Sequence, residues 1–274
     1  MSLKVKDIEN LFESIAPEAL KESYDNVGLM VGDSSSEVTS ILVSLDCTLD
    51  VIDEAVNKKC NLIINHHPLL FNKPKSITNS SLVGKKVMKA LSNCINIFAC
   101  HTNLDSVNGG LNDISMEILG FDNYTIIKPS SSDKAKGGIG RIAELQNPVT
   151  LGSLCDRVKK ALDIEIIKYS GNLDNNVNRI AVINGSGEDF FQNAIDLHAD
   201  CIITGDTTHH HLSDCLEQGV SVIDAGHFQL EWCAMKIVGK RLQTILNNNG
   251  YSNSVILSES NKSPYEYKGA VALK

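Results

Sequence analysis

Leu62-Ile-Ile-Asn-His-His-Pro68 places two adjacent histidines at the end of a short apolar run, which a proline then stops. A run of this length is typical of a buried strand. In an open parallel sheet, such a strand delivers its C-terminal residues to the edge where α/β proteins bind ligands and cofactors. The stretch therefore predicts an α/β fold with His66 and His67 at a binding edge.

The pattern around this stretch occurs twice in the chain. Residues 38–67 align without a gap with residues 177–206, and each copy has a β-branched run, a helical stretch and a second apolar run. The identities are Val38 and Val177, Ile41 and Ile180, Val43 and Val182, Asp50 and Asp189, Ala55 and Ala194, Ile63 and Ile202, and Ile64 and Ile203. Most are expected core positions, so the match reflects either a true duplication or convergent patterning of two βαβ units. Both explanations predict two similar α/β units.

Each copy continues with a further helix and a third strand, expected at 82–91 and 95–99 and at 211–217 and 220–223. This alternation predicts two α/β domains with largely parallel sheets flanked by helices. We place the domains at residues 1–128 and 129–274, with the alternative that the C-terminal segment packs back on the first domain. The Gly- and Ser-rich residues 130–140 are expected to form a hinge or linker, although glycines also suit a hairpin turn.

Composition excludes several classes of function. The formal net charge is −8 and the pI is near 5.5, with no dense basic stripe, so we expect no nucleic-acid partner. The N-terminus lacks the apolar core of a signal peptide, and no stretch approaches a membrane span. The 8 cysteines form no Cys-x-x-Cys, which favours buried free thiols in a reducing compartment. We therefore expect a cytoplasmic protein without a membrane partner.

Histidines recur in short polar patches that follow the expected strands. Successive side chains of a strand point to opposite sides, so His66 and His67 are better placed to serve two neighbouring ions than one. His101 follows the third strand of the first half, and Asp105 lies four residues later, before a glycine pair. A mixed nitrogen and oxygen ligand set accommodates Zn, Fe, Mn, Co or Ni. The pattern therefore suggests a dinuclear metal centre.

The second half contributes His227 and Glu231, whose i, i+4 spacing puts both side chains on one face of a helix at its first turn. A carboxylate in that position can bridge two metals. The other polar patches favour structural roles. They are the triplet 209–211 as a solvated helix start capped by Thr207 or Thr208, the glycine-rich turn 184–187, and His198 on a helix surface. No Gly-x-Gly-x-x-Gly supports a dinucleotide cofactor.

Taken together, the motifs resemble those of a known family. They are residues 24–33, Asn65-His-His-Pro68, His101-Thr-Asn-Leu-Asp105 with Gly109-Gly110, Gly185-Ser-Gly187, Gly205-Asp206 and Gly226-His-Phe-Gln-Leu-Glu231. Over nearly its whole length the chain is similar to the GTP cyclohydrolase 1 type 2 homologues of the Ngg-interacting-factor-three-like family. Two departures are mild: Tyr24 stands where tryptophan is usual, and Asp206 where glutamate is more frequent.

This resemblance implies two similar α/β domains with a dinuclear metal site in the cleft between them, assembled into a ring-shaped homohexamer. It also implies that His66 and Asp105 hold the first metal, that His67 and His227 hold the second, and that Glu231 bridges both. All of these positions carry the residue type of the family.

Two functional hypotheses follow. In the first, two divalent ions generate hydroxide near neutral pH, and the hydroxide attacks C8 of the guanine of GTP, opening the imidazole ring and releasing formate. His101 is then the candidate proton shuttle, because an imidazole can both take and give a proton near pH 7. Its alternative role is a hydrogen bond to Asp105 that supports the ligands. In the second hypothesis, the protein is a metal chaperone or a regulatory binding module without catalytic activity.

Overall fold

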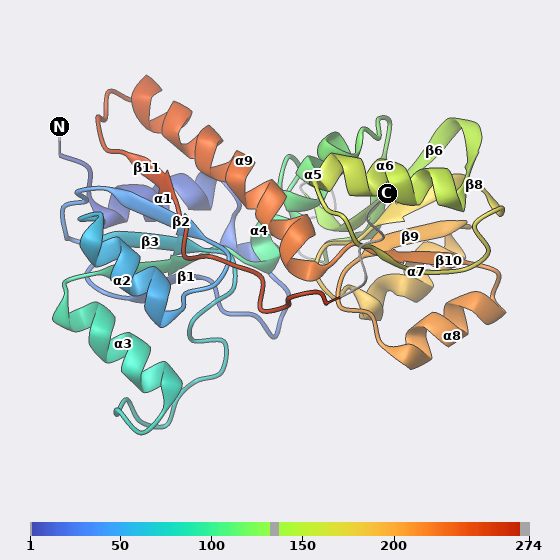
Figure 1. Ribbon diagram of the computed structural model, residues 1–274. Coiled ribbons are helices and arrows are strands. Elements are labelled where there is room, and N and C mark those ends of the chain that lie inside the picture. Colours follow the sequence, from blue (N-terminus) through green and yellow to red (C-terminus); the bar gives the residue numbers. More distant parts are fainter. Residues whose placement is uncertain (1, 132–136, 269–274) are drawn as a thin grey trace, which may run out of the picture.

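Two β-sheets, each with its own helices, make up the computed structural model, which describes residues 2–131 and 137–268. Figure 1 shows them as two lobes side by side, with the long helix α9 running between them and over the first. The expectation of two α/β units, each with a sheet flanked by helices, is confirmed.

The first sheet has the strand order β1-β4-β3-β2-β11. Its strands are β1 (Gly28–Val31), β2 (Ile41–Ser44), β3 (Leu62–Asn65), β4 (Asn96–Ala99) and β11 (Val255–Leu257). All neighbouring pairs are parallel except β1 with β4. Strands β2, β3 and β4 are buried along their whole length, as their apolar composition requires when helices cover both faces. Their C-terminal ends lie at one edge.

Helices cover the two faces of the first sheet. One face packs against α1 (Val5–Ile15) and the later part of α9 (His227–Asn248), and the other against α2 (Leu49–Asn57) and α3 (Leu82–Ser92). The hydroxyls of Thr48 and Ser81 cap α2 and α3 by accepting the backbone N–H of Val51 and Gly84. The short elements η1 (Glu18–Leu20) and α4 (Thr102–Ser106) lie near the binding edge, and α5 (Leu111–Leu119) leads towards the second lobe.

The second sheet has the order β5-β6-β8-β9-β10-β7. Its strands are β5 (Thr125–Pro129), β6 (Gly138–Thr150), β7 (Lys168–Ser170), β8 (Asn176–Val182), β9 (Cys201–Thr204) and β10 (Ser221–Asp224). The duplicated pattern correctly predicted the parallel core β8-β9-β10. Antiparallel strands extend this core on both sides, so this sheet is less parallel than expected.

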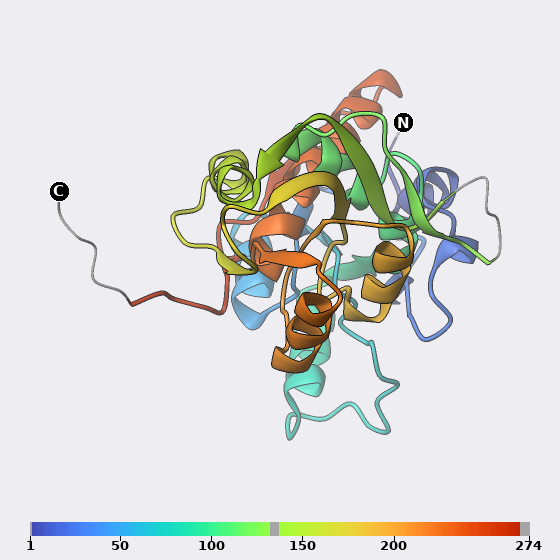
Figure 2. The same cartoon turned by 90° about the vertical axis from the view of Figure 1, so that its right-hand side faces the viewer.

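Helices also cover both faces of the second sheet. Helix α6 (Leu151–Leu162) packs with α5 and the start of α9 on one face, and α7 (Phe191–Asp196) and α8 (His209–Glu217) cover the other. Figure 2, with the second lobe facing the viewer, shows α6 (yellow-green) and α8 (orange) on opposite sides. The turn η2 (Glu188–Phe190) precedes α7.

The described ends of the segment expected as a hinge lie at the paired ends of two strands of the second sheet. Strands β5 and β6 pair with each other on either side of it, up to Pro129 opposite Gly138. The segment therefore joins neighbouring antiparallel strands, as the hairpin alternative proposed, and residues 132–136 of it lie outside the described residues. The boundary expected after residue 128 falls within β5.

Helix α9 and strand β11 carry the chain back from the second lobe to the first. Leu230, near the start of α9, belongs to the core of the second lobe, whereas Met235 and Leu242 belong to the core of the first. Strand β11 then pairs in parallel with β2. The first turn of α9 consequently lies between the two sheets.

Two expectations from composition concern the chain as a whole. All 8 cysteines are free, and only Cys94 is exposed. Among residues 2–131 and 137–268, none of the helices combines the length and the apolar character needed to cross a bilayer.

Candidate metal centre

The predicted site residues come from the ends of neighbouring elements. His66 and His67 follow β3, His101 follows β4, and Asp105 lies on α4. The N–H groups of His66 and His67 donate to the carbonyls of Ser44 and Leu45, so the backbone pairing of β2 and β3 continues to these residues. His227 and Glu231 lie on the first turns of α9, which enter the space between the lobes. The fold thus brings together residues separated by more than a hundred positions.

Glu231 lies at the middle of the cluster. Its Oε2 is 3.0 Å from Nε2 of His67 and 2.9 Å from Nε2 of His227. These two imidazole nitrogens are 3.1 Å apart. The other carboxylate oxygen, Oε1, is 3.8 Å from Nε2 of His66. Glu231 therefore faces histidines on both sides and comes from the opposite lobe.

His66 and Asp105 form the deeper part of the cluster. The His66 side chain is fully buried, and burial lowers its pKa to about 3, so the ring is neutral at physiological pH. Its Nε2 lies 3.6 Å from Oδ2 of Asp105. Among the described residues, neither Nε2 of His66 nor Oδ1 of Asp105 has a hydrogen-bond partner, although both atoms are buried. Buried polar atoms without partners are costly, and a bound cation would satisfy both.

In each of the four histidines of the cluster, an oxygen atom contacts the ring nitrogen Nδ1. Nδ1 contacts the Cys100 carbonyl in His66 (2.8 Å), Asp46 in His67 (2.9 Å), Asp25 in His101 (2.8 Å) and Asp206 in His227 (2.8 Å). Because a carbonyl oxygen can only accept, Nδ1 of the neutral His66 carries the proton and Nε2 presents a lone pair. Oxygen partners of this kind orient the histidines that bind metals in proteins. The arrangement leaves Nε2 of each ring for a ligand.

Two of these orienting carboxylates, Asp25 and Asp46, had no role in the sequence interpretation. Asp46 is the second residue after β2 just as His67 is the second residue after β3, so its place at a parallel strand end is the signal that could have found it. Burial opposes ionisation of Asp25, but hydrogen bonds from His101 and Thr102 lower its pKa to about 2. Nδ1 of His101 contacts Asp25, and no side-chain hydrogen bond joins His101 to Asp105 among the described residues, so the expected support of Asp105 by His101 stays a prediction. The shorter side chain of Asp206 still reaches His227.

Protons compete with any cation for the centre. Burial works against protonation of His67 and His227, but hydrogen bonds to Asp46 and Glu231 raise the pKa of His67 to about 10. Contacts with Glu231 likewise raise the pKa of His227 to about 9. The surrounding imidazoles hold the pKa of the buried Glu231 carboxyl well below its usual range. A cation must therefore displace protons, and its affinity falls as the pH is lowered.

Glycines allow the close approach of backbone segments around α9. A Cβ atom on Gly205 would lie 2.4 Å from the backbone nitrogen of His227, and one on Gly185 would lie 2.9 Å from Oε1 of Glu231. Gly226, the residue before α9, has φ +85°, a conformation that favours glycine. These positions let the ends of β8, β9 and β10 close around the first turns of α9.

The remaining polar patches lie outside the cluster. His209 begins α8 as expected, but no side chain caps this helix, because the Thr208 hydroxyl contacts His211 and that of Thr207 donates to Asp224. His198 is exposed and lies in a turn with φ +60° after α7, so its helical assignment is wrong. Residues 184–187 form a turn, with Gly185 and Gly187 in the left-handed region.

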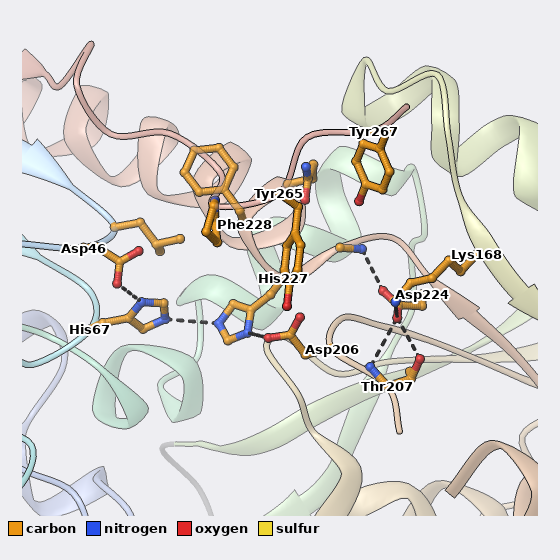
Figure 3. Close-up of a pocket in the computed structure, with 14 residues that line it drawn as sticks. Asp46, His67, Lys168, Asp206, Thr207, Asp224, His227, Phe228, Tyr265 and Tyr267 are labelled. Carbon is orange, nitrogen blue, oxygen red and sulfur yellow. Dashed lines mark hydrogen bonds and ion pairs between the residues drawn. The ribbon is translucent and has the colours of Figure 1, made fainter. Parts of the chain in front are cut away.

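Two cavities open beside the cluster, and His227 borders both. The first, of about 460 Å³, reaches His67, Asp46, Asp206 and the C-terminal segment. Figure 3 shows this cavity with the chain of contacts from Asp46 through His67 and His227 to Asp206. The second, of about 410 Å³, reaches His101, Asp105 and Glu231. The cluster is thus accessible to small molecules from two sides.

The donor atoms fall into two groups that share His67. One group contains His66, His67 and His101, and the other contains His67, His227 and Glu231, with the donor atoms of each group within 4.8 Å of one another. Imidazole nitrogens combined with carboxylates suit divalent transition metals. Together with the partnerless atoms of His66 and Asp105, this donor set fits divalent metal ions.

Comparisons with known proteins cover almost the entire chain. A model of the Duf34/NIF3 (NGG1p interacting factor 3) family matches residues 3–264. A protein of Clostridium acetobutylicum named GTP cyclohydrolase 1 type 2 homolog is 50% identical over 268 residues, which are 98% of this chain and 100% of the relative. A protein of the same name from Clostridium perfringens is 44% identical over 265 residues, covering 97% and 100% of the two chains.

Solved structures show the same fold. A Staphylococcus aureus hypothetical protein has a TM-score of 0.90 and 30% sequence identity, covering 98% of this chain and 100% of its own. A Bacillus cereus protein related to NIF3 has a TM-score of 0.92 and 25% identity, with the same coverage.

Proposed function

The chain belongs to the Duf34/NIF3 (NGG1p interacting factor 3) family, and from this premise we propose that it is a dinuclear metal-dependent hydrolase acting on a nucleotide. The observation that carries the proposal is the convergence of imidazole nitrogens, each oriented through Nδ1, on the buried carboxylate of Glu231 and the partly buried carboxylate of Asp105. The curated relatives are named GTP cyclohydrolase 1 type 2 homologs. The reaction we assign to this chain is hydrolytic opening of the guanine imidazole ring of GTP at C8 with release of formate.

We assign the ligands as the family resemblance implies. His66 and Asp105 would hold one ion, His67 and His227 would hold the other, and Glu231 would be the residue shared by both. Glu231 supports this assignment because its two carboxylate oxygens face different histidines. Divalent ions at such a centre lower the pKa of bound water towards neutrality. Asp46 and Asp206 keep the rings of His67 and His227 in the ligating orientation.

His101 is the proposed proton carrier. Its ring lies 5.0 Å from that of His66 between centroids, and it borders the second cavity with Asp105. Asp25 holds its Nδ1, so Nε2 is the nitrogen that takes a proton from the attacking water and returns it to the opening ring. Its place in a donor group with His66 and His67 supports a competing role as a ligand.

The direct test incubates the purified protein, loaded separately with Zn, Fe(II), Mn, Co or Ni, with GTP. We expect formate and a dihydroneopterin-type product with at least one of these metals. Both products should be absent with the Glu231→Gln variant. Absence of product with every metal, together with transfer of metal from this protein to an apo-acceptor, would instead favour a metal-handling role.

The His101→Ala variant separates the two roles of His101. We expect GTP turnover to fall by about 10²- to 10⁴-fold, the usual contribution of a general acid–base, while the metal content measured by elemental analysis is unchanged. His198→Ala removes an exposed histidine that is not among the described residues lining either cavity or forming either donor group, so it is the matched control and should keep full activity. Unchanged turnover would remove the proton-carrier role, and loss of metal would make His101 a ligand.

A further inference from the structure

The first cavity has a wall that comes from the far end of the chain. Pro264, Tyr265 and Tyr267 line it together with His67 and His227. Figure 3 shows the Tyr265 ring beside His227, between the His67–His227 pair and the Lys168–Asp224 pair in this view. We call residues 258–268 the C-terminal strap. Because the strap lies across the cavity, its side chains face whatever reaches the metal centre from this side.

Buried polar contacts hold the start of the strap in place. The carboxylate of the buried Glu54 accepts from the Ser258 hydroxyl (2.6 Å) and from the backbone N–H groups of Glu259 and Ser260 (2.9 Å each). Asn261 is also buried, and its Oδ1 accepts from the backbone N–H groups of Leu45 and Asp46, at 3.0 and 3.2 Å. The strap is therefore fixed three residues before Pro264, and it is tied to the loop that carries Asp46.

The two tyrosines of the strap are unusually exposed for such large rings. Tyr265 is 66% exposed and Tyr267 is 54% exposed. Neither ring has an aromatic partner among the described residues, whereas Phe228, on the same cavity wall, packs against Trp232. An exposed ring beside a cavity offers a stacking surface to a planar ligand.

A fixed positive charge lies at the same cavity. Lys168 Nζ is 2.6 Å from Oδ2 of Asp224, a buried carboxylate that also accepts from the Thr207 hydroxyl. An ammonium group has three donors, so the contact with Asp224 leaves others available to an anion. Among the described residues that line the second cavity there is no lysine or arginine, and the carboxylates there, Asp105, Glu188, Asp189 and Glu231, repel anions. The first cavity is lined by three carboxylates as well, but each of them pairs with a basic side chain: Asp46 with His67, Asp206 with His227 and Asp224 with Lys168. The feature that favours an anion in the first cavity is therefore the ammonium group of Lys168.

From this arrangement we propose that the first cavity binds a planar heteroaromatic ring carrying an anionic group, with the ring stacked on Tyr265 and the anion at Lys168. A purine nucleotide belongs to this chemical class. The inference rests on the proposed function only in taking the metal centre as the end where the ligand reacts. It makes the C-terminal strap the element that selects the substrate.

The test measures binding to the purified protein by calorimetry with three probes: GTP, guanosine, which lacks the anion, and inorganic triphosphate, which lacks the ring. Tyr265→Ala should weaken binding of GTP and guanosine by about 5- to 100-fold, the range for loss of one base–aromatic stack, and leave triphosphate unchanged. Tyr265→Phe should bind like the parent protein. Lys168→Gln should weaken GTP and triphosphate but not guanosine. Tyr169→Ala, an exposed tyrosine that does not line the cavity, is the matched control.

Unchanged GTP and guanosine binding by Tyr265→Ala, or failure of all three probes to bind the parent protein, would overturn the inference. Its failure differs from failure of the proposed function. If GTP binds through Tyr265 and Lys168 but yields no formate, the strap assignment stands and the hydrolase assignment falls. If formate forms while Tyr265→Ala and Lys168→Gln bind and turn over GTP normally, the hydrolase assignment stands and the strap assignment falls.

Discussion

The Glu231→Gln variant is expected to lose both metal ions while keeping its fold. Glu231 is 3% exposed, and its carboxylate touches His67 and His227 with one oxygen and faces His66 with the other. Glutamine has almost the same size as glutamate but carries no charge. An amide NH2 group, which donates, replaces one of the two carboxylate oxygens of glutamate. Loss of a partner that only orients a ligand costs about 10- to 100-fold in metal affinity, so loss of a shared ligand should cost at least about 100-fold.

Elemental analysis after gel filtration, followed by competition with a chelator, measures this effect. The matched control is Glu217→Gln, which removes an exposed carboxylate from α8 and should leave the metal content unchanged. Circular dichroism checks that both variants are folded. Retention of both ions by Glu231→Gln at the affinity of the parent protein would mean that Glu231 is not the residue the two sites share.

The sequence predicted the parallel strands and the candidate site because both depend on local patterns. The apolar runs that became β2, β3, β4, β8, β9 and β10 are short, buried and bounded by polar residues. Parallel strands meet at one edge, so the residues after β3 and β4 were expected to lie together, and the contacts of His66 and His101 agree with this. The i, i+4 spacing placed His227 and Glu231 on one face of α9.

What the sequence did not predict depends on contacts between distant segments. Asp25 was missed because a single acidic residue in a loop has no distinctive spacing. Asp46 follows a parallel strand, but that position alone does not show which histidine it contacts, and its role appears only when His67 approaches. Strand β6 was missed because its second half is largely exposed and polar, so its pairing with β5 and β8 comes from tertiary structure. The sequence also gave no signal for Tyr265 and Tyr267, because their place beside the first cavity depends on contacts between distant segments.

The Gly205→Ala variant is expected to disrupt the metal centre without changing any ligand. A Cβ atom at this position would lie 2.4 Å from the backbone nitrogen of His227 and 2.6 Å from its Cα. These are backbone atoms at the start of α9, so relief requires moving the helix turn that carries His227, and with it Glu231. Gly205 has an ordinary φ, so the effect comes from the clash and not from backbone strain. Overpacking of this kind typically costs about 1–3 kcal/mol in free energy of unfolding.

Thermal unfolding with and without added metal separates this positioning effect from a simple loss of stability. A ligand that binds only the folded state raises the Tm, and the rise shrinks when its affinity falls. Gly205→Ala should therefore lower the Tm of the metal-free protein and also reduce the increase in Tm caused by metal.

The matched control is Gly152→Ala in the first turn of α6, where the nearest atom to a new Cβ lies at 3.5 Å. This control should be neutral or slightly stabilising, since alanine favours helix. A full metal-induced rise in the Gly205→Ala variant would show that α9 tolerates displacement from β9, and that the close approach at Gly205 does not position the ligands.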